Sequence, residues 1–146
     1  MSDYKKILLC LDLTEESERI AVRAQSLAAR YGAELSLLHV VEYVPVEPMG
    51  EALLPAVQIE GELLERARVR IAELAAKLGL QGCEQLVHTG TIKSEVVRIA
   101  QTRGIDLIVI GSRERHGVSI LFNFTEDTVL HAAPCDVLAV RLQHRD

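Results

Sequence analysis

The chain has 146 residues, of which 49% are hydrophobic and 25% charged, the mix of a folded globular domain. This composition excludes intrinsic disorder, collagen-like repeats and low-complexity sequence, and a chain of this length folds without disulfides or metal ions. Sixteen Lys and Arg residues against 21 Asp and Glu residues give a net charge of −5, which disfavours binding to nucleic acid or to anionic membranes.

The amino-terminal segment carries no recognisable targeting signal. Its apolar run, Ile7–Leu11, is too short for a signal peptide and for a membrane span. The three cysteines, Cys10, Cys83 and Cys135, are odd in number and widely spaced, without a Cys-x-x-Cys motif. We therefore expect buried, reduced thiols and a cytoplasmic location.

The sequence predicts a strand near the amino terminus and a helix after it. Apolar residues run almost without interruption through Lys5–Leu11, which is typical of a strand buried on both faces of a sheet. Thr14 is a candidate N-cap for the helix, and Glu15 and Glu16 favour its positive start. Apolar residues at helical spacing continue to Gly32, where the sequence predicts that the helix ends.

A second strand is predicted over Glu34–Val41. Residues Tyr43–Pro55 carry three of the four prolines, so we expect an irregular surface loop there. Within Ala56–Leu78 the apolar side chains form one helical stripe opposite Glu and Arg residues. This pattern predicts a long amphipathic helix that ends at Gly79.

The second half of the chain continues this alternation. A shorter third strand is predicted over Cys83–His88, followed by a helix that Thr91 or Ser94 caps and Gly104 ends. The fourth strand is predicted over Asp106–Ile110, another nearly uninterrupted apolar run.

The fourth predicted strand leads directly into a polar loop. Gly111 and Ser112 follow the strand, and the loop continues through Arg113–Gly117. A last short helix is predicted over Thr125–Ala132, and a fifth strand over Asp136–Leu142.

Strands that alternate with helices predict the fold class. We expect one α/β domain spanning residues 1–146, with a five-stranded parallel sheet and helices on both faces. Such sheets bind ligands beyond the carboxyl ends of their strands, where the strand order reverses. The first and fourth strands are the expected pair at that point, and their carboxyl ends carry Asp12 and Gly111–Ser112.

Four segments of the chain resemble the universal stress protein family, and together they cover nearly its whole length. They are Tyr4–Asp12, Leu37–Val41, Asp106–Arg113 and His131–Arg141. The resemblance implies a Rossmann-like sheet in the order 3-2-1-4-5 and a homodimer formed by pairing of the two fifth strands. An apolar strand at the edge of a sheet agrees with such pairing. The residues implied in the dimer are Asp136, Val137, Leu138, Ala139, Val140 and Arg141.

Some members of the family bind ATP, and the resemblance identifies the corresponding positions. They use an Asp after the first strand for adenine, backbone near the end of the second strand, and a Gly-x2-Gly-x9-Gly-(Ser/Thr) motif after the fourth. Glycines in that motif let backbone N–H groups approach the phosphates. The candidate nucleotide-binding residues implied here are Asp12, Val40, Val41, Gly111, Ser112, Arg113, Gly117 and Thr125.

Two of the three motif glycines are replaced, by Glu114 and Phe124. A carboxylate about 4 Å from a phosphate charge costs on the order of 4 kcal/mol at an effective dielectric of about 20. That cost corresponds to roughly three decades of affinity. Phe124 adds a ring where the motif requires bare backbone. In this respect the chain resembles the branch of the family that lacks the motif and does not bind ATP.

The sequence shows neither a catalytic nor a metal-binding pattern. Ser112 lacks the Gly-x-Ser-x-Gly context of a nucleophile, so we expect no catalytic residues. The histidines lack the spacing of metal ligands, so we expect no metal site; they are His39, His88, His116, His131 and His144. His39 reads as a strand-end histidine whose hydrogen bonds are satisfied locally.

Three functional hypotheses follow. The leading one is a non-catalytic stress-response homodimer that acts through contacts with unidentified proteins and holds no cofactor. The alternative is a switch that binds ATP or AMP, with or without Mg²⁺, and the third is a weak ATPase or phosphotransferase, for which no base or metal ligands are assigned. Asp12 stays open between an adenine contact and a helix cap. The resemblance to the branch that does not bind ATP implies that Thr125 and Thr128 are candidate phosphoacceptors, and Thr125 is alternatively a helix cap.

Overall fold

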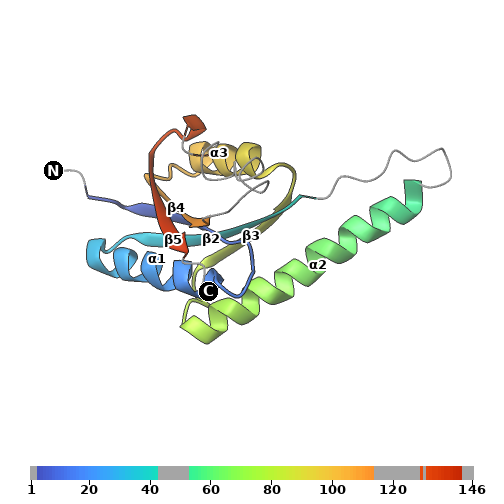
Figure 1. Cartoon of the computed structure of the whole chain (residues 1–146), viewed down its shortest axis with the longest axis horizontal. Coiled ribbons are helices and arrows are strands. Elements are labelled where there is room, and N and C mark those ends of the chain that lie inside the picture. The colour runs from blue at the N-terminus through green and yellow to red at the C-terminus, as the bar shows by residue number, and fades with distance from the viewer. Residues whose placement is uncertain (1–2, 43–52, 114–128, 130, 143–146) are drawn as a thin grey trace.

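Five parallel strands form one sheet in the order β3-β2-β1-β4-β5 (Figure 1). The computed structural model describes residues 3–42, 53–113, 129 and 131–142, with side chains for all of them except residues 53–57, 113 and 142. The strands are β1 (Lys6–Cys10), β2 (Glu34–Val41), β3 (Glu84–Thr89), β4 (Leu107–Arg113) and β5 (Asp136–Leu142). The predicted Rossmann-like α/β fold, its strand order and the switch between β1 and β4 are confirmed.

Helices cover both faces of the sheet. The helices are α1 (Ser17–Tyr31), α2 (Leu53–Leu78) and α3 (Ile92–Thr102). Figure 1 shows α1 and α2 on one side of the sheet and α3 on the other. None of the helices described is both long enough and apolar enough to cross a membrane.

The two sheet faces bury separate halves of the core. Ile7 and Leu9 of β1 pack with side chains of α1 and α2, whereas Leu8 and Cys10 pack with α3. Successive side chains of a strand point to opposite faces, so a strand covered on both sides must be apolar at every position. This is why β1 reads as one uninterrupted apolar run. Each such Leu or Ile contributes about 1.5–3 kcal/mol by leaving water.

The start of α1 differs from the prediction. Thr14 does not cap the helix: α1 begins at Ser17, its N-cap is Glu16, and no side-chain bond caps it there. Instead the Thr14 hydroxyl donates to Asp12 Oδ1, so it is committed to the preceding turn. The predicted end is confirmed, because Gly32 adopts a left-handed conformation with φ of 63° as the C-cap.

The start of α2 and the end of β4 also differ from the prediction. Helix α2 begins at Leu53, so the predicted loop 43–55 ends earlier than expected. Pro55 then lies in the first helical turn, where the proline's missing N–H is tolerated. Strand β4 continues to Arg113 instead of stopping at Ile110, because Gly111, Ser112 and Arg113 pair with the last three residues of β5.

The remaining predicted elements agree closely with the structure. Thr91 caps α3 by accepting from the Ser94 backbone N–H at 3.3 Å. Strand β5 has the predicted bounds, and β1 and β3 differ from prediction by one residue at each end. Of the predicted helix 125–132, only Val129, His131 and Ala132 are described, and all three are helical.

Candidate functional site

Asp12 lies directly after β1, at the carboxyl edge of the sheet, and is exposed. Its Oδ1 accepts three hydrogen bonds within the same turn. The donors are the Thr14 backbone N–H at 3.0 Å, the Thr14 hydroxyl at 2.8 Å and the Ser17 hydroxyl at 3.0 Å. A side chain that bonds the backbone two residues on forms an Asx-turn, which here orients the chain toward α1.

The bond from the Ser17 hydroxyl shows what Asp12 contributes to the structure. Ser17 is only 2% exposed, so its hydroxyl needs a partner inside the protein. Asp12 supplies that partner at 3.0 Å. The sequence leaves Asp12 open between an adenine contact and a helix cap, and this geometry supports a structural role at the start of the helix. Oδ2, the second carboxylate oxygen, takes no part in these three bonds.

Leu13 turns the chain between Asp12 and α1. It has φ of +60°, and it is the one non-glycine residue in the described part of the chain with a positive φ. Its side chain is buried in the core, and the Arg70 guanidinium of α2 donates to its carbonyl oxygen. A left-handed conformation costs an L-residue about 1–2 kcal/mol. Two anchors, one apolar and one polar, therefore hold the turn that positions Asp12.

The end of β2 forms the neighbouring part of the edge. Val40 is buried, and Val41 is half-buried with its carbonyl accepting from the Gly90 N–H at 3.2 Å. His39 Nδ1 bonds the Leu11 carbonyl at 2.7 Å, which makes it the locally satisfied histidine that the sequence predicts. The candidate backbone contacts at Val40 and Val41 thus lie at the predicted edge.

Glu42 follows β2 and reaches the start of α3. Its Oε2 accepts from the Ile92 backbone N–H at 2.9 Å. A carboxylate at a helix amino terminus satisfies a free N–H group and interacts favourably with the helix dipole.

Strand β4 brings Gly111 and Ser112 to the same edge. Both are half-buried and remain part of the strand, paired in register with Val140 and Arg141 of β5. Arg113 is the last residue of β4. The sequence predicts a loop from Gly111 onward. This prediction is wrong for its first three residues, which lie in β4.

The remaining motif positions lie outside the described residues. These are Gly117 and Thr125, the substituted glycine positions Glu114 and Phe124, and the candidate phosphoacceptor Thr128. The structure therefore brings Asp12, Val40, Val41, Gly111 and Ser112 to the carboxyl edges of three adjacent strands.

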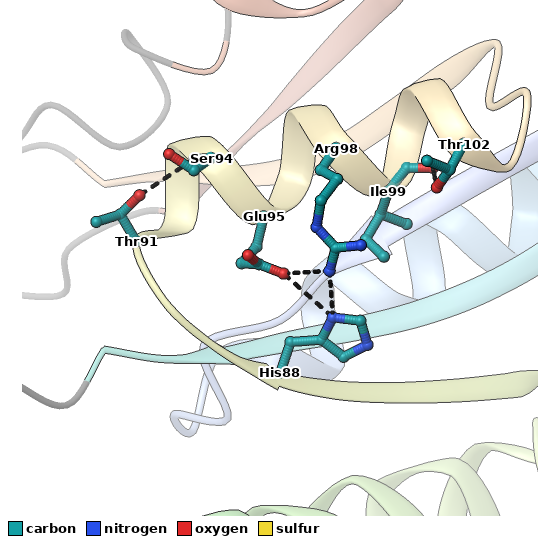
Figure 2. Close-up of polar contacts among 7 residues, drawn as sticks. All are labelled: His88, Thr91, Ser94, Glu95, Arg98, Ile99 and Thr102. Carbon is teal, nitrogen blue, oxygen red and sulfur yellow. Dashed lines mark hydrogen bonds and ion pairs between the residues drawn. The ribbon is translucent and has the colours of Figure 1, made fainter.

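Sequence reasoning missed a polar cluster between β3 and α3 (Figure 2). Glu95 Oε1 accepts from Arg98 Nη2 at 2.6 Å and lies 3.1 Å from His88 Nδ1. The bond from Arg98, together with the weaker contribution of His88, holds the pKa of Glu95 below its usual value despite partial burial. The spacing of Glu95 and Arg98 on one helix face is visible in the sequence. The contribution of His88 depends on how the helix packs on the sheet.

The three thiols differ in their burial. Cys10 is buried, and burial, followed by the nearby Cys135, raises the pKa of its thiol to about 12. Cys83 and Cys135 are only half-buried, so the expectation of buried thiols is wrong for these two. Within the described ranges, His, Cys, Asp and Glu side chains do not gather in groups of three or more that could hold a metal ion.

Comparison with known proteins agrees with this architecture. Residues 3–141 match the model of the universal stress protein family. Universal stress protein A homolog 2 of Coxiella burnetii is 40% identical over 144 residues, which cover 98% of this chain and 99% of the relative.

Solved structures show the same fold. Universal stress protein UspA from Lactobacillus plantarum superposes with a TM-score of 0.76 at 21% identity, over 97% of this chain and 100% of that one. A universal stress protein crystallised in complex with cAMP superposes with a TM-score of 0.63, also at 21% identity, over 95% and 98% of the two chains. The family match spans nearly the whole chain and includes four strands of the sheet completely and all of β5 but its last residue. The chain therefore belongs to the universal stress protein family.

Proposed function

We propose that this chain is a non-catalytic stress-response protein of the cytoplasm that acts as a homodimer through contacts with other proteins. The observation that carries the proposal is the position of β5. It is the last strand of the sheet, and β4 is its one neighbour within the described residues. As far as residues 3–42, 53–113 and 131–142 are concerned, its outer edge is therefore available to a further strand.

The side chains of β5 suit such a contact. Val137 packs against the α3 side of the core, and Leu138 and Val140 pack against the α1 side, so the strand is anchored on both faces. Ala139, at the centre of the strand, is exposed. A symmetric pair of β5 strands would give a continuous ten-stranded sheet without a free edge at that side.

The proposal includes no ATP binding at the carboxyl edge. Supporting it are the three local hydrogen bonds that occupy Asp12 Oδ1 and the substitutions in the sequence at Glu114 and Phe124. The charge on Glu114 alone would lower affinity for a triphosphate by roughly three decades if it faces the phosphates.

The dimer is tested by substituting Ala139→Glu. In a two-fold pairing the central residues of the two strands face each other, so two carboxylates would meet across the interface. Analytical ultracentrifugation should give a dimer for the wild-type chain and at least a tenfold weaker dimer for the variant. Ala76→Glu, at an exposed position of α2, is the matched control and should leave the dimer intact. A wild-type monomer at all concentrations, or an unaffected Ala139→Glu dimer, contradicts the proposal.

The second candidate function is an adenine-nucleotide switch. Its support is the gathering of Asp12, Val40, Val41 and Gly111 at the carboxyl edge of three adjacent strands, where Rossmann-like sheets bind ligands. A similar structure was crystallised with cAMP.

Isothermal titration with ATP-Mg, AMP and cAMP separates the two candidates. No heat of binding at millimolar nucleotide supports the non-binding protein. Micromolar binding that is lost in Asp12→Ala and retained in the control Asp3→Ala supports the switch, because Asp3 is also exposed but lies before β1.

A further inference from the structure

One nitrogen atom, His88 Nδ1, lies between two side chains of α3 that make opposite demands on it (Figure 2). Arg98 Nη2 is 2.9 Å from Nδ1, and Glu95 Oε1 is 3.1 Å from it. Arg98 Nη2 also donates to Glu95 Oε1 at 2.6 Å. All three contacts are within hydrogen-bond distance.

A ring nitrogen cannot satisfy both neighbours at once. Arginine only donates, so Arg98 bonds to Nδ1 when that atom carries a lone pair. An ionised carboxylate only accepts, so Glu95 bonds to Nδ1 when that atom carries a proton. Protonation of the imidazole therefore replaces the bond from Arg98 by a bond to Glu95. It also makes His88 a cation whose Nδ1 lies 2.9 Å from the Arg98 guanidinium.

We infer that His88, Glu95 and Arg98 form a proton-operated latch between β3 and α3, in which protonation of His88 releases Arg98. At high pH the neutral ring carries its proton on Nε2 and accepts from Arg98. At low pH the imidazolium donates to Glu95, and Arg98 moves into solvent. The latch does not depend on the dimer or on nucleotide binding.

Burial decides which side chain moves. The Arg98 side chain is 51% exposed, whereas that of Glu95 is 16% exposed. Glu95 also lies against the backbone of Gly90, where an added Cβ would be 3.1 Å from Glu95 Cγ. The carboxylate is thus held in place and the guanidinium has room to leave. The lowered pKa of Glu95 keeps it ionised throughout the range in which imidazoles titrate.

The other elements around His88 contribute few charges. The neighbour in register on β2 is the apolar Val40, and α2 packs on the opposite face of β3. On the α3 side, the carboxylate of Glu42 is engaged with the Ile92 N–H at the helix start. In the described part of the chain, Glu95 and Arg98 are the charged groups in contact with the ring.

The direct test is an NMR titration of the full-length, ¹⁵N-labelled protein. At high pH, His88 should show an unprotonated Nδ1, and the Arg98 guanidinium protons should exchange slowly with water. As His88 titrates, Nδ1 should become protonated and exchange at Arg98 should accelerate with the same midpoint. A protonated Nδ1 at high pH, or Arg98 exchange that does not follow the His88 midpoint, overturns the latch.

Two variants test the opposing charges. Arg98→Gln keeps an N–H donor but removes the positive charge, so the His88 midpoint should rise by about 0.5–1 pH unit. Glu95→Gln removes the carboxylate, so the midpoint should fall by a similar amount. Lys93→Gln, at an exposed position of α3, is the matched control for loss of a positive charge and should shift the midpoint much less. Unchanged midpoints in Arg98→Gln and Glu95→Gln contradict the proposal.

Discussion

The left-handed residue Leu13 allows a sharp test, because Leu11 is its matched control. Both are leucines of the same core cluster, and both are 5% exposed. Only Leu13 has a positive φ, of 60°. Replacing each by Ala and by Gly separates the loss of packing from the release of backbone strain.

The packing loss is common to both sites. Truncating a buried Leu to Ala costs about 3–5 kcal/mol. Continuing from Ala to Gly normally costs a further 0.5–1 kcal/mol or so of backbone entropy and about 0.8 kcal/mol for the buried methyl group. At position 11 the Gly variant should therefore be about 1.5 kcal/mol less stable than the Ala variant. At position 13 the change to Gly also relieves about 1–2 kcal/mol of left-handed strain, so the two variants should be nearly equal.

Urea denaturation followed by circular dichroism measures all four free energies of unfolding. The prediction concerns the difference between the Ala-to-Gly steps at the two sites, so the uncertain packing cost cancels. If Gly is as much worse than Ala at position 13 as at position 11, the turn after β1 holds no left-handed strain.

Three further predictions concern other parts of the molecule. Glu95→Gln should flatten the dependence of stability on pH below about pH 4.5, because the bonds from Arg98 and from His88 lower the folded pKa of Glu95. The stabilisation from the Glu95 carboxylate is complete above its unfolded pKa and is lost as the pH falls through its folded pKa; urea midpoints at several pH values measure this. Cys10 should resist iodoacetamide in the native protein, because burial raises the pKa of its thiol to about 12, whereas the half-buried Cys83 reacts sooner; mass spectrometry reads both. Gly90→Ala should cost about 1–3 kcal/mol of stability, since φ is +140° and the new Cβ would meet Glu95.

Each of these has a contradicting outcome. A Glu95→Gln profile parallel to the wild-type profile in acid would mean that its ion pair contributes nothing to folding. Equal labelling rates at the two cysteines would contradict the burial of Cys10. For the glycine, the control is Gly82→Ala, where nothing lies within 4 Å of the added Cβ and φ is not positive. Equal stabilities of the two alanine variants would argue against crowding at Gly90.

Much of the fold was predictable because its signals are local. Strands buried on both faces, such as β1, show continuous apolar runs. The end of α1 at Gly32 follows from a glycine in a left-handed conformation. The extension of β4 to Arg113 was not predictable in this way, because pairing with β5 keeps Gly111 and Ser112 in the strand. That pairing joins residues far apart in the sequence.

The sequence identified candidate residues of the site but not the contacts that these residues make. Asp12 was identified as a candidate, but its bond to the buried Ser17 hydroxyl depends on the turn at Leu13. A positive φ at a leucine goes against local preference, and tertiary contacts maintain it. The error at Thr14 has the same origin, since its hydroxyl serves the Asp12 turn. Residues that act across elements, such as His88 and Arg98, become neighbours only after α3 packs on the sheet.

The central position of β1 has a consequence for synthesis on the ribosome. β1 is made first, yet one of its two neighbours, β4, begins at Leu107. Roughly 100 residues separate the two strands, which corresponds to about 5–20 s of translation at usual rates. Throughout that time at least one edge of this buried apolar strand is unpaired. The sheet is therefore completed only late in synthesis, and until then the open edge of β1 is a site at which non-native pairing can start.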